Sequence, residues 1–336
     1  MNDQIVKNDP ISSLLSNLSP DSTLAIISPT SFEKLDENSQ LILQKFPSSF
    51  TSNLSYESIL GSLKFQPKTV LGIGGGTAID FSKFIAKYMN SKCIAVPSML
   101  STNAFATNKV AVSSNSSKHT ESGVLPHEVW IDQEYLAKSP QENLYGLLDV
   151  FSIFSALRDW EYAQKYQGIK IVPDIFKRAL VIMIQSIIVA KHENQDILKL
   201  FSVIRDSGYI TNEYGSGRPE SGSEHIFASA LESLMDIPHA FSVTLGLHIM
   251  EFFNFYGTIK SSNPFSILPF NSLGIIEKIN QLQIPWVLIK YVLNHLQPRS
   301  DKFTLIDIIQ DFLSIPNIQE SLHRKLIYYG FKFFEE

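Results

Sequence analysis

Three consecutive glycines lie between a short apolar run and an amphipathic segment, and this pattern constrains the fold more than any other feature of the chain. The motif is GIGGGTAID; it overlaps a β-branched run at 69–73 and leads into a helical pattern at 77–89. A glycine turn after a strand lets backbone N–H groups and a helix N-terminus approach a phosphate without obstruction by Cβ atoms. The sequence therefore predicts a βα unit with a dinucleotide-binding turn. Its candidate cofactor-binding residues are Gly74, Gly75, Gly76, Thr77 and Asp80.

The turn also has a simpler interpretation as a tight βα connection that binds no ligand, and the glycines alone leave both open. The strand before it and the helix after it favour the dinucleotide, and Thr77 is placed to cap that helix and to bond a phosphate. An earlier βα unit, with a strand at 23–28 and a helix at 31–46, precedes the turn. The segment 28–30 is thus a candidate for contact with the adenosine end of the cofactor.

The chain changes its pattern at Ser139-Pro140. Before this point, further strands are predicted at 93–97 and 128–132, separated by a Ser-, Thr- and Asn-rich excursion at 98–122 that contains a hairpin. Beyond it, helical periodicity predicts long helices, among them 143–166, 173–191, 194–203, 222–235 and 239–256. We expect an α/β, Rossmann-like N-terminal domain at 1–140 and an all-α C-terminal domain at 141–336.

Composition excludes several classes of function. The net charge is −5 with scattered Lys and Arg, so the chain lacks the basic footprint of a nucleic-acid-binding protein, and a small-molecule substrate is expected. The single cysteine, Cys93, permits no internal disulfide and no multi-thiolate metal site. No window approaches the roughly 20 apolar residues of a membrane span, and the N-terminus lacks the pattern of a signal peptide. A cytoplasmic location is expected.

One acid and two histidines suggest a metal site. Asp149 lies in the apolar helical pattern GLLDVFSIFSALRDW, where a buried carboxylate must be paired or coordinated to offset its desolvation. His225 and His239, 14 residues apart, each stand near the start of an apolar helical run. An Asp-His-His set with open positions suits catalytic zinc, nickel or iron. Either histidine taken alone is better explained as a hydrogen-bonded residue near a helix start, because no short-range ligand spacing supports a metal.

Five segments, in this order and at similar spacing, resemble signatures of the glycerol-1-phosphate dehydrogenases of the dehydroquinate synthase-like, or iron-containing alcohol dehydrogenase, superfamily. The segments are GIGGGTAID, PSMLSTN at 97–103, LLDVFSIFSALRDW at 147–160, RPESGSEH at 218–225 and IPHAFSVTLG at 237–246. The resemblance covers about residues 20 to 260 and includes the ten-residue spacing from Asp149 to Asp159-Trp160. Relatives that are dehydroquinate synthases usually have Glu at the first ligand, so Asp149 favours the dehydrogenases.

This resemblance implies one divalent metal, zinc by preference or nickel or iron, held by Asp149, His225 and His239, with the nicotinamide of NAD or NADP beside it. The implied reaction is reversible hydride transfer to the ketone of a dihydroxyacetone-phosphate-like, phosphorylated or polyhydroxylated substrate, with the metal as Lewis acid. Ser98 and Ser101 match the family's cofactor-contacting stretch, although a polar turn after a strand explains them equally well. Lys109 is a candidate for a substrate phosphate, against the ordinary case of a solvated loop lysine.

Several positions depart from the family pattern. Asn103 stands where the family has Asp, so a group expected to meet substrate or relay a proton is neutral and cannot act as a base. Leu148 and Ala240 stand where the family has Gly, and Ile153 stands where it has Lys or Asn. We expect these changes to make the surroundings of the site more apolar. Because the ligand triad and the glycine turn are retained, we expect the chemistry to be kept while the substrate differs.

Two alternatives come from other classes of function. A cyclase or lyase like dehydroquinate synthase would oxidise and re-reduce the same substrate with bound NAD and give no net NADH. A non-catalytic homologue that acts as a binding or structural subunit would hold no metal. The choice between NAD and NADP stays open at this stage. The aromatic C-terminus at 326–336 predicts packing against the core or against a second copy in a homo-oligomer.

Overall fold

The computed structural model describes residues 4–51, 61, 65–114, 117–192, 196–256, 268–270 and 273–334. The chain divides into two compact units, Met1–Gly146 with Asp196–Tyr209, and Leu147–Gln195 with Ile210–Glu336. We call them unit 1 and unit 2. Among the described residues, none of the helices is long and apolar enough to cross a membrane. The boundary at residue 140 inferred from the sequence stays a prediction.

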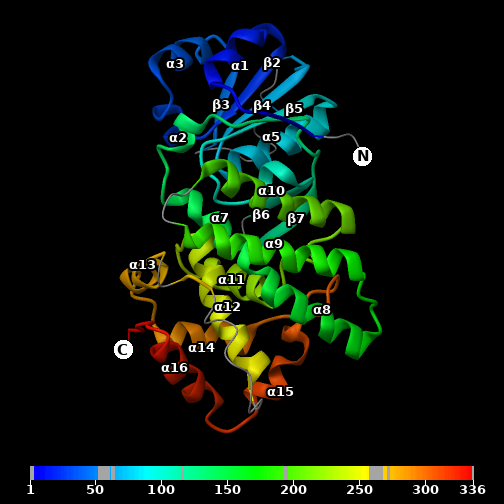
Figure 1. Cartoon of the computed structure of the whole chain (residues 1–336), viewed down its shortest axis with the longest axis vertical. Coiled ribbons are helices and arrows are strands. Elements are labelled where there is room, and N and C mark those ends of the chain that lie inside the picture. Colours follow the sequence, from blue (N-terminus) through cyan, green and yellow to red (C-terminus); the bar gives the residue numbers. More distant parts are fainter. Residues whose placement is uncertain are drawn as a thin grey trace. The chain divides into compact units, whose positions relative to one another are not determined.

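Unit 1 is built on a six-stranded, all-parallel sheet with the order β1-β8-β5-β4-β2-β3. The strands β2, β3, β4 and β5 of this sheet are labelled in Figure 1. Its strands are β1 (Ile5–Lys7), β2 (Thr23–Ile27), β3 (Ser48–Phe50), β4 (Thr69–Gly74), β5 (Lys92–Pro97) and β8 (Glu128–Trp130). Its helices are α1 (Ile11–Asn17), α2 (Pro29–Glu33), α3 (Glu37–Leu43), α5 (Gly76–Met89) and α6 (Gln133–Leu136). The expected α/β, Rossmann-like architecture is confirmed.

Both faces of the sheet are buried because alternate residues of each strand point to opposite sides. In β2, Ala25 and Ile27 join the cluster that packs under α1 and α3. Leu24 and Ile26 join the other cluster, which packs under α5. Each layer therefore excludes water from one face. The carboxyl end of β4, where the glycine turn lies, is consequently supported by apolar packing on both sides.

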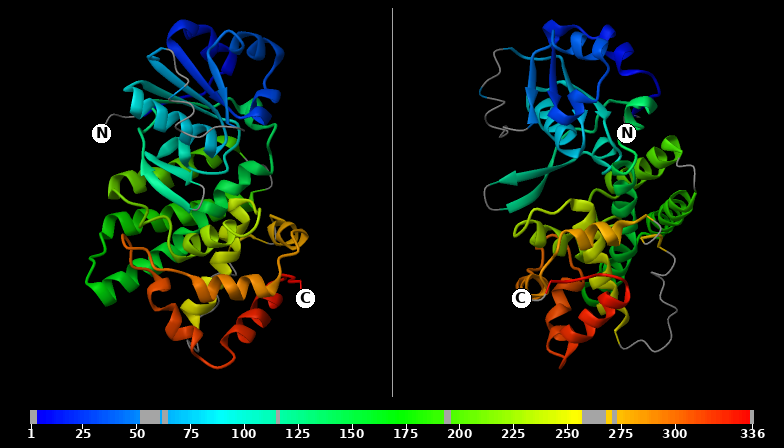
Figure 2. Two further views of the ribbon diagram at one scale, coloured as in Figure 1. Left: turned by 180° about the vertical axis from the view of Figure 1, so that it is seen from behind. Right: turned by 90° about the vertical axis from the view of Figure 1, so that its left-hand side faces the viewer.

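Two details of unit 1 bear on the predictions. The segment 98–122 contains the expected hairpin, formed by β6 (Lys109–Ser114) and β7 (Ser117–Ser122), an antiparallel ribbon that stands apart from the six-stranded sheet (Figure 2). The predicted helix at 31–46 is wrong, because two short helices occupy this range. The first, α2, ends at Glu33, and Asp36 is the N-cap of the second: its carboxylate accepts the Ser39 N–H at 2.9 Å and caps α3.

Unit 2 is helical, as the sequence predicts. Its helices are α7 (Tyr145–Phe151), α8 (Ile153–Gln167), α9 (Pro173–Lys191), α11 (Ser223–Glu232), α12 (His239–Phe255), α13 (Ile275–Gln281), α14 (Trp286–His295), α15 (Ile309–Leu313) and α16 (Ile318–Tyr328). The helix α10 (Ile197–Tyr214) has its first residues in unit 1 and its last in unit 2. The prediction at 194–203 captures only part of α10.

The predicted helix at 143–166 is wrong as a single element. It is a 3-10 turn at Glu142–Leu144 followed by α7 and α8, with an interruption at Ser152. The Ser152 hydroxyl donates to the Asp149 carbonyl, and also to the Glu220 carbonyl at 2.6 Å. A hydroxyl that bonds back to the preceding turn competes with the helical ladder, and this explains the break. The break immediately follows the turn that carries Asp149.

The C-terminus packs against its own unit. Phe331 is 1% exposed and its ring lies 4.9 Å from the ring of His248. The N–H of Trp286 donates to the carbonyl of Phe334 at 3.1 Å. Of the two predicted destinations for this aromatic segment, the described residues support packing against the core of the same chain.

Candidate metal centre and dinucleotide-binding turn

The structure brings Asp149, His225 and His239 together within unit 2. Asp149 lies on α7, His225 in the first turn of α11, and His239 is the first residue of α12. His225 Nε2 lies 3.0 Å and His239 Nε2 3.9 Å from Asp149 Oδ1, and the ligand atoms of the three residues lie within 4.8 Å of one another. The side chains are 12%, 23% and 39% exposed in that order, so a ligand from solvent has access. Three separate helices thus converge on one point.

A buried carboxylate lies behind each histidine. His225 Nδ1 is 2.7 Å from Glu224 Oε1, and His239 Nδ1 is 2.7 Å from Glu232 Oε1. Neither glutamate was predicted from the sequence. Glu224 could have been identified from the sequence, because it directly precedes His225. Glu232 is seven residues before His239 and contacts it only because α11 and α12 pack against each other.

Electrostatics determine the protonation of this cluster when it holds no metal. Burial alone would lower the pKa of His225, but hydrogen bonds and the charges of Asp149 and Glu224 outweigh it and raise the pKa to about 10. Burial alone would raise the pKa of each acid. The hydrogen bond and charge of His225 outweigh burial and hold the pKa of Asp149 and of Glu224 below their usual values. The buried carboxylates thus favour positive charge at this point, and a proton on His225 competes with a metal ion for the Nε2 lone pair.

The donor set fits a divalent cation. Two imidazole Nε2 atoms and one carboxylate oxygen are ligands that zinc, nickel and iron accept, and they leave coordination positions open. Three carboxylates, Asp149, Glu224 and Glu232, supply negative charge that offsets the positive N-terminal ends of α11 and α12. A metal would bind in competition with protons, because the histidines must be neutral to coordinate it.

A second buried layer holds the loop before α11. Asp159 is fully buried; its carboxylate accepts the Ser223 N–H at 2.6 Å and the Leu305 N–H at 2.7 Å. Lys302 Nζ donates to the carbonyls of Gly217, at 3.0 Å, and Ser221. Burial and the neighbouring Glu224 raise the pKa of Asp159 to about 7, while burial lowers the pKa of Lys302 to about 8. Asp159 and Lys302 thus hold the loop before α11 in place through hydrogen bonds to its backbone.

Three of the four departures from the family pattern, all except Asn103, are buried apolar residues. Leu148 and Ile153 are fully buried and Ala240 is 6% exposed. Leu148 and Ala240 are next to Asp149 and His239 in the chain, and Ile153 begins the helix that follows Asp149. None of the three adds a polar group to the centre. That these residues make the surroundings of the site more apolar stays a prediction.

The glycine turn lies in unit 1 between β4 and α5. Gly74 has φ +154°, and a Cβ there would lie 2.7 Å from Ala78 Cβ, so only glycine fits. Gly75 is the N-cap of α5, and a Cβ on Gly76 would lie 2.9 Å from Thr102 Oγ1. Thr77 does not cap the helix, which is a correction: the helix starts one residue earlier, and Thr77 is exposed in its first turn. The first N–H groups of α5 therefore make no hydrogen bond to a capping side chain.

The other predicted residues of unit 1 have defined positions. The Ser98 N–H donates to the Gly74 carbonyl at 3.0 Å, and its hydroxyl accepts from Ser31 at 2.8 Å. Asp80 pairs with Lys83 at 2.7 Å and accepts the Ala111 N–H, which joins α5 to β6. Asn103 donates to the Ser207 hydroxyl at 3.1 Å.

Ser101 and Lys109 complete the set of predicted residues. Ser101 is half-buried in the bend after β5, and Lys109 begins β6 with its carbonyl accepting from Lys83. Ser98 is thus next to the glycine turn, whereas Asp80 contacts the hairpin. The functional roles of these residues remain predictions.

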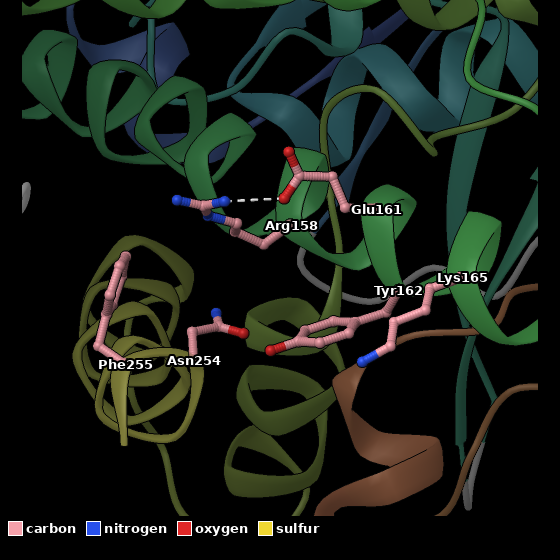
Figure 3. A pocket seen from close by; sticks show the side chains of 6 residues that line it. All are labelled: Arg158, Glu161, Tyr162, Lys165, Asn254 and Phe255. Atoms are coloured by element: carbon pink, nitrogen blue, oxygen red, sulfur yellow. Dashed lines mark hydrogen bonds and ion pairs between the residues drawn. The ribbon is translucent and has the colours of Figure 1, made fainter. Parts of the chain in front are cut away.

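A separate hollow of about 310 Å³ opens on unit 2 between α8 and the end of α12 (Figure 3). Its lining residues are Arg158, Glu161, Tyr162, Lys165, Asn254 and Phe255. Arg158 is paired with Glu161 at 2.8 Å and stacks over the Phe255 ring at 5.5 Å. Asp149, His225 and His239 do not line it.

Comparisons with known proteins agree with the resemblance inferred from the sequence. Residues 42–140 match the family model "iron-containing alcohol dehydrogenase". The chain is 30% identical over 202 residues to the glycerol-1-phosphate dehydrogenase (NAD(P)+) of Thermoplasma volcanium, covering 55% of each chain. It is 32% identical over 186 residues to the enzyme of the same name from Sulfolobus acidocaldarius, covering 54% of this chain and 51% of that one. The alignments thus span about half the length of these curated relatives.

The whole fold matches solved structures at low identity. A probable glycerol dehydrogenase from Sinorhizobium meliloti superposes with a TM-score of 0.70 at 14% identity, covering 98% of both chains. At this identity the likeness concerns the fold alone. The chain is therefore similar in sequence to the iron-containing alcohol dehydrogenases and the glycerol-1-phosphate dehydrogenases, and it has their fold of an α/β unit with a helical unit.

Proposed function

We propose that this chain is a metal-dependent, NAD(P)-linked dehydrogenase that reduces the ketone of a small phosphorylated or polyhydroxylated substrate. The observation that carries the proposal is the convergence of His225 and His239 Nε2 on Asp149 Oδ1, with a carboxylate behind each imidazole. The similarity to glycerol-1-phosphate dehydrogenases and the glycine turn of unit 1 support it.

In this proposal Asp149, His225 and His239 hold one divalent cation. Such a cation supplies Lewis-acid chemistry, drawing electrons from a ketone oxygen so that the carbonyl carbon accepts hydride. Leu148, next to Asp149 in the chain, and Ile153, which begins the following helix, are fully buried and supply no polar group to this proposed site. Asn103 is neutral and holds no proton to exchange, so a proton for the product oxygen comes from another donor.

The cofactor in this proposal binds at the turn from Gly74 to Thr77. The uncapped N-terminal N–H groups of α5 and the positive end of its dipole favour a pyrophosphate. The Ser98 hydroxyl lies beside this turn, because the Ser98 N–H bonds the Gly74 carbonyl. Parallel assays with NADH and NADPH identify the preferred dinucleotide.

The test combines metal analysis with turnover. The purified protein is assayed for bound zinc, nickel and iron, and for NAD(P)H oxidation with dihydroxyacetone phosphate and a panel of related ketones. Asp149→Ala and His225→Ala remove ligands; His295→Ala, an exposed histidine on α14 that bonds the Tyr291 carbonyl, is the matched control. We expect both ligand variants to lose metal and turnover and the control to keep them.

Two results would replace the proposal. Stoichiometric metal with substrate conversion but no net NAD(P)H oxidation would indicate the lyase chemistry of dehydroquinate synthase-like enzymes. A wild-type protein that holds no metal under any loading condition would indicate a non-catalytic relative. The ketone with the highest kcat/KM identifies the substrate.

A further inference from the structure

The two histidines of the candidate centre have the same surroundings although they lie on different helices. Each presents Nε2 to Asp149 and Nδ1 to a glutamate at 2.7 Å. We propose that Glu224 and Glu232 are positioning residues that hold both imidazoles in one tautomer and orientation, so that the metal site is formed before metal binds. This inference rests on the proposed metal site and assigns two residues beyond its ligands.

The chemistry of imidazole gives the reason. A neutral imidazole carries one proton, and the nitrogen that carries it cannot coordinate a cation. A carboxylate at Nδ1 retains the proton there and leaves the Nε2 lone pair free for the metal. It also disfavours rotation about the Cβ–Cγ bond, since a flipped ring would place Cδ2, which carries no N–H, against the glutamate and would lose the hydrogen bond. Glu224 and Glu232 therefore select the nitrogen that faces Asp149.

Glu224 is itself rigidly held. Its side chain is fully buried, and its Oε1 accepts the Gly222 N–H at 2.6 Å as well as bonding His225. The loop before it is fixed by Asp159 and Lys302. A Cβ on Gly222 would lie 2.1 Å from Asp159 Oδ2, so the loop approaches this carboxylate as closely as glycine permits. The position of Glu224 thus depends on packing that needs no metal.

Glu232 is held differently. It is the last residue of α11 and meets the first residue of α12, and the Ser242 hydroxyl donates to the oxygen that bonds His239. Its side chain is 4% exposed, compared with 39% for His239. The histidine nearer to solvent is therefore anchored by an almost fully buried acid. Packing of α11 on α12 fixes this pair, and the Asp159 layer fixes the other.

The experiment measures Co²⁺ binding to the metal-free full-length protein, by titration of the visible absorption of bound Co²⁺ in competition with a chelator. The variants are Glu224→Ala, Glu224→Gln, Glu232→Ala and Glu232→Gln. Glu251→Gln is the matched control, because Glu251 is a buried acid on α12 that accepts from the Tyr329 hydroxyl rather than from an imidazole. The unfolding midpoint of each metal-free variant is measured in parallel.

We expect the Ala variants to weaken Co²⁺ binding by about 10- to 100-fold, the usual range for lost outer-shell partners of metal ligands. The Gln variants should lose less, because the amide oxygen still accepts the Nδ1 proton while the charge is gone. The Co²⁺ absorption bands should shift in the glutamate variants and stay unchanged in the control. A shift of the Co²⁺ bands reports a change at the metal ligands themselves, which a purely structural role of the glutamates would not produce.

Two failures are distinguishable. Tight Co²⁺ binding by the wild type with equal affinity and unshifted bands in all four variants would overturn this inference and leave the metal site standing. No Co²⁺ binding by the wild type would remove the proposed function, and with it this inference. If the Ala variants do not fold, the Gln variants decide the matter, since their side chains match glutamate in size.

Discussion

At the scale of single residues, the buried acids of unit 2 differ in charge because of what faces them. Asp149 faces an imidazole, which holds its pKa below the usual value. Glu251 faces the Tyr329 hydroxyl and, more distantly, Lys325, and burial raises its pKa to about 7. An acid with a raised pKa makes stability depend on pH in a direction that can be worked out.

Glu251→Gln should remove this pH dependence. In the unfolded chain the carboxyl has a pKa near its model value of 4.5, so between pH 4.5 and 7 the folded state binds more protons. The free energy of unfolding thus falls as the pH rises through this window, by roughly 3 kcal/mol in total. Denaturant unfolding at pH 5 and pH 8 should give a smaller loss in the variant than in the wild type.

The control for this pH experiment is Glu320→Gln, an exposed acid on α16. It should show the pH dependence of the wild type. An identical fall in stability between pH 5 and pH 8 for Glu251→Gln and the wild type would contradict the assigned burial of this carboxyl.

Residue types and order predicted Asp149, His225 and His239, and the structure brings them together. The glutamates behind the histidines were not predicted. Glu232 reaches His239 through the packing of two helices, and no local spacing encodes that contact. Thr77 was assigned as the cap because it is the first capping-type residue after the glycines, whereas glycine N-caps α5 without a side chain.

At the scale of elements, the glycines of the turn look alike in the sequence but differ in how much space the fold leaves for a side chain. Gly74 is demanded by the backbone, since its φ of +154° and the 2.7 Å approach to Ala78 exclude a Cβ. At Gly75 a Cβ would make only an ordinary contact, 3.6 Å from Met99 Sδ. A methyl group there would disturb the fold little but, under the proposed function, would obstruct the pyrophosphate of the dinucleotide.

Gly75→Ala and Gly74→Ala therefore form a matched pair. Gly74→Ala should destabilise unit 1 by about 1–3 kcal/mol, the usual cost of overpacking. Gly75→Ala should melt like the wild type but bind NAD(P)H more weakly, measured by fluorescence titration. Wild-type NAD(P)H affinity in a folded Gly75→Ala variant would show that the turn does not hold the dinucleotide.

The C-terminal segment offers a second test at this scale. Phe331 is 1% exposed and packs its ring on His248, so Phe331→Ala should cost about 3–5 kcal/mol in the free energy of unfolding. Tyr328→Ala, at a side chain that is 80% exposed, should change little. Equal stabilities of the two variants would argue against packing of this segment on its own unit.

Elements with strong periodicity were predicted well, and those interrupted by side chains were not. The helix at 173–191 and the strands β2, β4, β5 and β8 followed from apolar patterns, because burial of one or both faces dictates those patterns. The edge strands β1 and β3 were not predicted, since each is only three residues long and largely exposed. The breaks at Asp36 and Ser152 were missed, since a cap or a back-bonding hydroxyl needs only one residue and leaves the periodicity intact.

At the scale of the whole molecule, alternating strands and helices followed by helices alone predicted the fold class. The assignment of Asp196–Tyr209 to unit 1 was not predictable from the sequence. The periodicity of a helix shows that one of its faces is buried, but it does not show against which of the two cores that face packs. The metal cluster belongs entirely to unit 2 and the glycine turn to unit 1. The proposed reaction needs both, so it is a property of the full chain.

The most direct test of the proposed function is removal and return of metal. The protein is stripped with a chelator, and NAD(P)H oxidation with the best ketone of the panel is measured before stripping, after it, and after addition of zinc, nickel or iron. We predict that turnover is lost with the metal and returns when one divalent ion per chain is bound. Net NAD(P)H oxidation that persists at the original rate in the metal-free protein would contradict the proposal.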